Sequence, residues 1–279
     1  MSKGNLDTAG MGERAGVVLF SQWNQFSELS ELVLAKGSAD SIHDLRVASR
    51  RMRATVDVLA PFIAGKDVTY ISKKLRRVTR EVGRLRNIDE AVIYFGAAPV
   101  PVPVLSSMLA AARVKEMEAV TDVLKQFPRG KMDKLLRRAV AELAGAANDD
   151  HEMSIYLSEI SLQRYQAVYD LILPATIPEN VETRHALRIT IKKWRYLLEV
   201  LGQVCRHDYS TALETLKEYQ TLLGYLNDMA EFRVLCSTLD LPKEENNGCA
   251  AVLERDTAAY LARFIETAAA RPLQYTFVL

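Results

Sequence analysis

Apolar residues recur along the whole chain at the spacing of amphipathic α-helices. Between residues 40 and 62, Leu45, Met52 and Val56 follow one another at intervals of seven and four, and basic residues occupy the other side. Prolines fall between the periodic stretches, and the alternation typical of strands is weak throughout. The pattern predicts an all-α fold with short loops between antiparallel neighbours and helices near residues 15–36, 40–62, 67–94, 103–126, 131–146, 150–173, 180–206, 209–239 and 244–270.

One motif occurs twice in the chain: HDLRVASRRMR at residues 43–53 aligns without a gap to HALRITIKKWR at 185–195, an offset of 142. A second pair follows in the same order, because GRLRNIDE at 83–90 aligns to GYLNDMAE at 224–231, an offset of 141. Two patterns that recur at nearly the same distance indicate an internal repeat. The sequence therefore predicts two similar helical bundles, residues 15–146 and 150–270, after a flexible stretch at 1–14.

The overall composition is that of an ordinary soluble protein. The chain has 279 residues, 49% of them hydrophobic, and its 36 Lys and Arg nearly balance 35 Asp and Glu. Affinity for a polyanion must therefore come from uneven placement of charge. Three cysteines without a CxxC pair favour a reducing compartment, and we see no signal peptide or membrane-spanning segment. We expect a cytoplasmic protein that does not enter a membrane.

Positive charge is concentrated on one face of the repeated helix. On a helical wheel the cations of each copy fall within roughly 80° of one another, opposite the apolar residues. They are His43, Arg46, Arg50 and Arg53 in the first copy and His185, Arg188, Lys192 and Arg195 in the second. The helix that follows the first copy adds Lys73, Arg76, Arg77, Arg80 and Arg84. Like charges three and four residues apart repel, so we expect this stripe to need an external anion.

The residue types indicate which anion would fit. Arginine matches phosphate oxygens with two parallel N–H donors, and lysine adds a mobile point charge. One cation per helical turn places contacts about 5.4 Å apart, which suits an extended, repeating polyanion better than a small phosphate compound. The chain has neither GxxxxGK[ST] nor a GxGxxG after a strand, so a nucleotide-dependent enzyme is disfavoured.

Other interpretations of the basic face are a solvated surface, a nucleic-acid-binding site and a helical module that docks an acidic protein. Binders of single-stranded nucleic acid interleave exposed aromatic residues with cations, and residues 43–53 and 73–84 contain no aromatic residue. Trp194 lies on the apolar side of its helix, where we expect it in the core. The stripes also lack the carboxylates or sulfurs of a metal site, so we expect no metal, no cofactor and no catalysis.

The doubled motif H-x-L-R-[VI]-x-x-[RK]-[RK]-x-R, each time followed by a G-x-L turn with RN or ND, resembles the CHAD domain (conserved histidine α-helical domain) over about residues 15–270. The resemblance implies two four-helix bundles with pseudo-twofold symmetry. It also implies that inorganic polyphosphate binds in a basic groove between them and that the protein joins polyphosphate granules and their proteins. The basic positions of the motif are His43, Arg46, Arg50, Arg51 and Arg53, and His185, Arg188, Lys192, Lys193 and Arg195. The ExExK signature of the triphosphate tunnel domain found in many relatives is missing, so we expect a stand-alone member.

Two points stay open at the level of sequence. His43 and His185 can donate to phosphate, or they can cap and pack helices. The second half also departs from the first, because Glu214, Glu218 and Thr221 take the places of Lys73, Arg77 and Arg80, and only Lys217, opposite Arg76, keeps its charge. The site is therefore expected to lie mainly on the first half.

Overall fold

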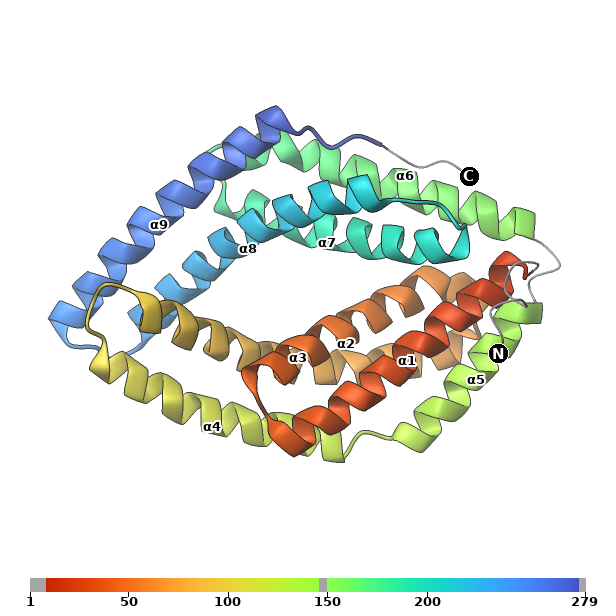
Figure 1. Ribbon diagram of the computed structural model, residues 1–279, viewed down its shortest axis with the longest axis horizontal. Coiled ribbons are helices and arrows are strands. Elements are labelled where there is room, and N and C mark those ends of the chain that lie inside the picture. The colour runs from red at the N-terminus through yellow and green to blue at the C-terminus, as the bar shows by residue number, and fades with distance from the viewer. Residues whose placement is uncertain (1–8, 146–149, 276–279) are drawn as a thin grey trace.

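The all-α fold is confirmed by the computed structural model, which describes residues 9–145 and 150–275 (Figure 1). Within these two stretches the chain forms nine α-helices, whose ends lie within four residues of those expected. The helices are α1 (Met11–Lys36), α2 (Ala39–Leu59), α3 (Gly65–Ala97), α4 (Pro103–Lys125), α5 (Arg129–Gly145), α6 (Asp150–Ala175), α7 (Val181–Val204), α8 (Ser210–Thr238) and α9 (Lys243–Ala270).

Local chemistry sets the ends of the helices around the basic motif. Gly37 ends α1 in the left-handed conformation at φ 56°, which glycine adopts without steric cost. Ser38 then caps α2, because its side chain accepts a hydrogen bond from the backbone N–H of Ser41 at 3.2 Å. α2 ends at Leu59, earlier than predicted, because the chain tightens into a 3₁₀ turn, Ala60–Phe62, that contains Pro61.

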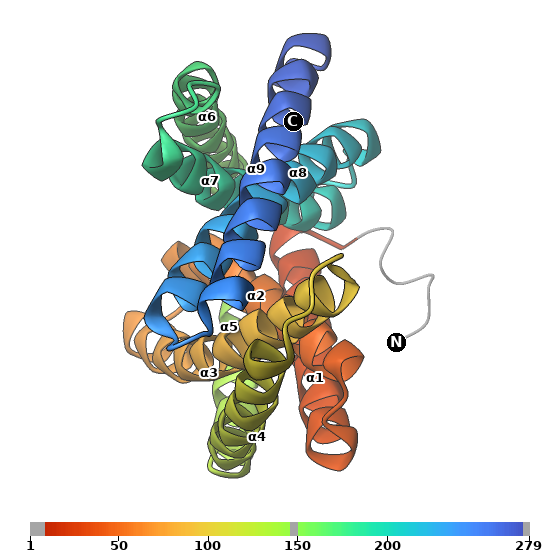
Figure 2. The same cartoon turned by 90° about the vertical axis from the view of Figure 1, so that its left-hand side faces the viewer.

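The helices form two groups, with α1–α5 in one and α6–α9 in the other (Figure 1, Figure 2). In the first group α1 packs on α2, α2 on α3 and α3 on α4; in the second, α6 packs on α7, α7 on α8 and α8 on α9. An internal repeat predicts this shared order, and the pseudo-twofold symmetry itself stays a prediction. The first group also has a fifth helix, α5, which packs along α1.

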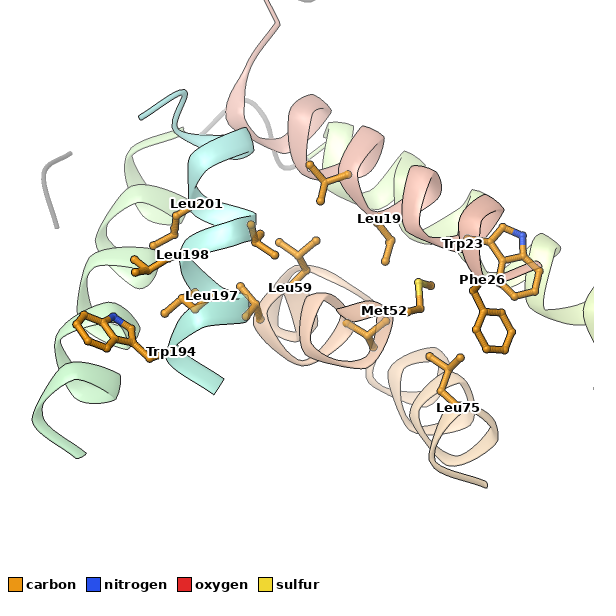
Figure 3. Close-up of a cluster of buried hydrophobic side chains, with 14 of the residues drawn as sticks. Leu19, Trp23, Phe26, Met52, Leu59, Leu75, Trp194, Leu197, Leu198 and Leu201 are labelled. Carbon is orange, nitrogen blue, oxygen red and sulfur yellow. The ribbon is translucent and has the colours of Figure 1, made fainter. Parts of the chain in front are cut away.

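Two apolar clusters join the groups. In the larger one, buried residues of α1, α2 and α3 such as Leu19 and Met52 are continuous with Trp194 and Leu197 of α7 (Figure 3). Trp194 is 1% exposed, so its predicted place in the core is confirmed. The smaller cluster joins α3 and α4 to α8 and α9. There Glu245 of α9 accepts hydrogen bonds from the first backbone N–H groups of α4. Two separate apolar clusters thus hold together the two groups of helices that contain the basic helices α2 and α7.

Candidate anion-binding site

Four cations meet where α2 packs on α7. They are Arg46 and Arg50 of α2 and Arg188 and Lys192 of α7, and we call them the central cluster. Burial, and then the charges of Arg50 and Arg188, lower the pKa of Arg46 to about 10. Burial, and then the three arginines, lower the pKa of Lys192 to about 6. Lys192 is only 7% exposed, so its amino group and the three guanidinium groups are held together here in a poorly hydrated place.

The central cluster is not neutralised by carboxylates in contact with it. Among the described residues none of the four cations forms a salt bridge, and the buried Nε of Arg188 has no hydrogen-bond partner. Asp228 of α8 is the main acid whose field reaches Arg46, Arg188 and Lys192, and burial raises its own pKa. Uncompensated buried charge of this kind is costly, so the arrangement fits a bound anion.

A second group of cations continues from the central cluster and surrounds Asp57 of α2. It consists of Arg53 of α2, Arg76 of α3, Lys193 of α7 and Arg164 of α6. Burial lowers the pKa of Arg53 and raises that of Asp57, and the four cations oppose the shift at Asp57. Arg164 was not predicted, because it lies outside both copies of the motif and only helix packing brings it here. We call this group together with the central cluster the cationic band.

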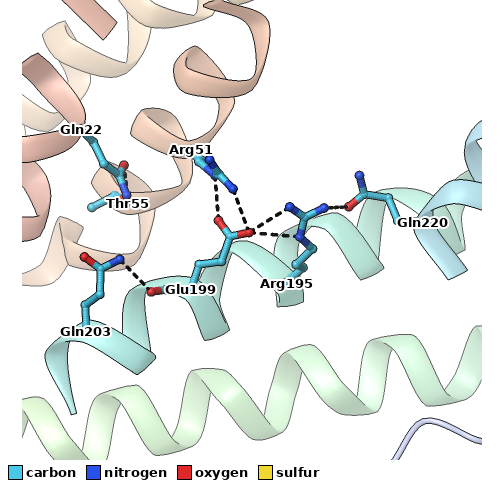
Figure 4. Close-up of polar contacts among 7 residues, drawn as sticks. All are labelled: Gln22, Arg51, Thr55, Arg195, Glu199, Gln203 and Gln220. Atoms are coloured by element: carbon cyan, nitrogen blue, oxygen red, sulfur yellow. Dashed lines mark hydrogen bonds and ion pairs between the residues drawn. The ribbon is translucent and has the colours of Figure 1, made fainter. Parts of the chain in front are cut away.

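Arg51 and Arg195 belong to the motif but are already paired inside the protein. Both guanidinium groups contact the carboxylate of Glu199, Arg51 from α2 at 2.9 Å and Arg195 from α7 at 3.0 Å (Figure 4). Arg195 also donates to Oε1 of Gln220 on α8 at 2.8 Å. The carboxylate thus bridges the two halves and occupies two guanidinium groups that were predicted to meet the ligand.

The stripe on α3 is less uniform than its sequence indicated. Arg80 and Arg84 both pair with Glu81, at 2.8 Å and 3.0 Å, so these two cations of the stripe already have a partner inside the protein. Arg77 donates to Oε1 of Gln126 at the end of α4. Neighbouring Arg76 lies near Arg53 instead, and Lys73 is exposed. On α3 it is therefore Arg76 that joins the cationic band.

The two motif histidines have different surroundings. His43 is exposed near the start of α2. His185 shares a 2.7 Å hydrogen bond between its Nδ1 and Oδ1 of Asn227, and the amide nitrogen of Asn227 donates to Glu231 at 2.8 Å. Because the amide oxygen is an acceptor, Nδ1 of His185 carries the proton and Nε2 is left for another partner. A contact of either histidine with a ligand stays a prediction.

The substituted positions of the second half lie on α8, where they are exposed or paired with another residue of this half. Glu218 pairs with Arg271, which follows α9, at 2.6 Å, much as Arg77 reaches the end of α4. Glu214, Lys217 and Thr221 are exposed on α8. Within the described ranges 9–145 and 150–275, no group of three or more His, Cys, Asp or Glu is arranged to hold a metal ion, and no helix is long and apolar enough to cross a membrane.

The comparisons with known proteins agree with the resemblance to the CHAD domain and with the helical fold. The family model of the CHAD domain matches residues 18–237, and the chain belongs to this family, a helical family associated with polyphosphate binding and metabolism. The crystal structure of the CHAD domain from the plant Ricinus communis is similar, with 17% identity, a TM-score of 0.63 and coverage of 96% of this chain and 89% of that one. PptA from Streptomyces chartreusis is 16% identical, with a TM-score of 0.59 and coverage of 93% and 98%. No curated protein matches the chain.

Proposed function

We propose that the protein binds inorganic polyphosphate along the cationic band. The observation that carries the proposal is the central cluster, in which Arg46, Arg50, Arg188 and Lys192 lie together without a salt bridge to any described residue. A bound polyanion supplies the missing negative charge and the acceptor for Nε of Arg188. The association of the CHAD family with polyphosphate supports the same ligand.

The shape of the band favours a long chain over a single phosphate. Arg46, Arg50 and Arg53 follow one another by about one turn along α2, so their spacing is about 5.4 Å along the axis. A polyphosphate chain can contact several turns at once and can also reach Arg188 and Lys192 on α7. Contacts that are linked in one ligand raise the overall affinity far above that of one phosphate.

A competition experiment tests the ligand. Labelled long-chain polyphosphate is bound to the purified protein, and unlabelled polyphosphate, RNA, ATP or orthophosphate is added at equal total phosphate. We expect only unlabelled polyphosphate to displace the label efficiently, and we expect binding to weaken steeply with salt. Competition by ATP would contradict an extended site, and equal competition by RNA would favour a nucleic-acid-binding protein. Arg46→Ala and Arg188→Ala should weaken binding, whereas Lys115→Ala, an exposed cation of α4 outside the band, serves as the control.

We further propose that binding occurs without hydrolysis and directs the protein to polyphosphate granules. Release of orthophosphate during incubation with polyphosphate is the measurement for the first point, and none is expected. For the second, a fluorescent fusion should overlap with stained granules and lose the overlap in the Arg46→Ala, Arg188→Ala double variant. A fusion that stays on the granules without these two cations would require a different mode of recruitment.

A further inference from the structure

The outer face of α6, opposite the core, is apolar. Four side chains lie there within about 40° on a helical wheel: Ile155 (45% exposed), Leu162 (43%), Tyr169 (63%) and Leu173 (77%). The residues that α6 buries are Met153, Leu157, Ser161, Val168 and Ala175, on its other side. A helix of a globular protein normally has one apolar face, which it turns to the core, so a second one indicates a contact surface.

The equivalent helix of the first half shows what can pack beside such a face. The repeat offset of 142 maps the buried positions of α6 onto residues of α1 that are also buried: Met11, Ala15, Leu19, Phe26 and Val33. The same offset maps Leu162 onto Phe20 and Leu173 onto Glu31. The two helices therefore present corresponding faces to the core and corresponding faces outward.

On α1 the helix α5 packs along one edge of the corresponding face, where Gly16 lies against Val140, and the side chain of Glu31 stays 70% exposed. Arg137 of α5 lies over the ring of Phe20, with 4.7 Å from its Cζ to the ring centroid, and Arg129 at the start of α5 pairs with Glu31 at 2.6 Å. Figure 1 shows α5 running along α1, whereas no described helix runs along this face of α6. The first half thus has a fifth helix beside this face of α1, whereas no described helix lies beside the corresponding face of α6.

The described segment that follows α9 covers only one edge of α6. The hydroxyl of Tyr165 donates to the carbonyl oxygen of Leu273 at 3.5 Å, and the rings of Tyr165 and Tyr275 have their centroids 5.2 Å apart. Tyr169 and Leu173, one and two turns further along α6, keep the large exposed fractions given above.

The charge beside the open face is negative. Glu159 and Asp170 are exposed there, and the half-buried Arg164 faces Asp57 of α2 instead. The helix that covers α1 is in contrast rich in cations: Arg129, Lys131, Lys134, Arg137 and Arg138. We propose that the outer face of α6 is a docking site for an amphipathic helix of a partner protein, whose apolar stripe packs on the four exposed apolar side chains and is flanked by lysines or arginines.

A second copy of the chain fits this face less well than a basic helix. Two α6 helices in parallel would set Glu159 against the same residue of the other copy. An antiparallel pair that matches Ile155 with Leu173 would set Glu159 beside Asp170 of the other copy. Both arrangements bring carboxylates together, which is unfavourable, whereas a basic helix neutralises them.

The test uses a labelled peptide with the sequence of residues 129–145, the α5 helix, titrated with the full chain in the absence of polyphosphate. We expect saturable binding to the unmodified chain, and loss of about tenfold or more in affinity in the Tyr169→Lys, Leu173→Lys double variant. Both side chains are exposed, so the variant should keep its melting temperature. Val114→Lys changes an equally exposed apolar residue of α4, 62% exposed, and is the matched control. A peptide with Leu136→Glu, which spoils the apolar stripe of α5, should not bind.

Several results would overturn the proposal. Absence of saturable binding, or equal binding by the chain with and without the two α6 substitutions, would show that α6 does not hold a basic helix. Sedimentation of the unmodified chain as a dimer that the double variant abolishes would assign the face to a second copy. Peptide binding only after removal of residues 276–279 would assign it to the end of this chain.

Discussion

Lys192 lies among Arg46, Arg50 and Arg188, with Asp228 of α8 as the main nearby acid. Burial and the three arginines lower the pKa of its ammonium group to about 6, so most of the side chain is neutral at pH 8. A bound polyanion favours the charged form and raises this pKa. Binding at pH 8 is therefore coupled to uptake of a proton, and the affinity should fall as the pH rises above about 6.

This prediction can be checked by titration calorimetry at pH 8. The heat of binding should depend on the ionisation enthalpy of the buffer, in the direction of proton uptake by the complex. Lys192→Met keeps an unbranched side chain of similar length and removes the titrating group, so the proton uptake should fall. Proton uptake that is unchanged in Lys192→Met would assign it to another residue.

The sequence predicts the burial of single apolar residues far better than the ion-pair partners of single charged residues. Periodicity was sufficient to predict the burial of Leu45, Met52 and Trp194, which are 0%, 0% and 1% exposed. Burial of an apolar helix face follows from the local spacing of its residues. The pairing of Arg51 was not predictable in this way. Its carboxylate partner, Glu199, is 148 residues away in the sequence, and only the packing of α2 on α7 brings the two together.

Among the secondary-structure elements, α7 supplies cations of the site and also the carboxylate of Glu199, which holds Arg51 of α2 and Arg195 of α7. Because Glu199 occupies Arg51 and Arg195, it competes with the polyanion for these two groups. Glu199→Gln should therefore strengthen polyphosphate binding. By analogy with single-stranded nucleic acids, two additional contacts should steepen the log–log dependence of affinity on salt by about 1.4.

The salt dependence of binding, measured for both proteins, checks the role of Glu199. Glu31→Gln is a suitable control, because Glu31 also pairs with an arginine, Arg129, but lies on α1 at the contact with α5. Weaker binding by Glu199→Gln would mean that the carboxylate is needed to hold the two arginines in place for the ligand.

Two neighbours on α3 allow the boundary of the cationic band to be tested within one element. Arg76 and Arg77 are both exposed arginines, but Arg76 lies near Arg53 and Asp57, while Arg77 contacts Gln126 of α4. Arg76→Ala should weaken polyphosphate binding and flatten the salt dependence by about 0.7, whereas Arg77→Ala should change affinity by less than about twofold. Equal losses in a direct binding titration would extend the band over the whole stripe of α3.

The helices could be predicted from the sequence with little error, but the contacts of their charged side chains could not. Helical periodicity and proline positions placed each helix end within four residues, because both are local signals. The helical wheel grouped Arg77 with Arg80 and Arg84, yet it contains no information on which neighbour each side chain meets. Glu81 pairs with Arg80 and Arg84, which the wheel alone did not indicate.

On the scale of the whole molecule, the cationic band depends on how the two halves are held together. The larger core joins α1 and α2 to α7, and the smaller one joins α3 and α4 to α8 and α9, so the cations of α2 and α7 face each other before any ligand arrives. Such preorganisation lowers the entropy cost of binding. The same arrangement places Arg46 close enough to Arg188 for the two charges to repel each other, and this repulsion opposes the association of the halves.

A ligand that contacts both halves relieves this repulsion and links them. Long-chain polyphosphate should therefore raise the melting temperature of the protein, because it binds the folded state and connects α2 to α7. At equal total phosphate, tripolyphosphate should raise the melting temperature much less, since a short chain engages few turns at once. Differential scanning fluorimetry of the unmodified chain and of Arg188→Ala measures the effect. Without ligand the variant should melt at an equal or slightly higher temperature, because the repulsion between Arg46 and residue 188 is removed. It should lose part of the shift with long chains, because fewer contacts tie the second half to the first. Equal shifts from long and short chains, or a full shift in Arg188→Ala, would place the ligand on one half only.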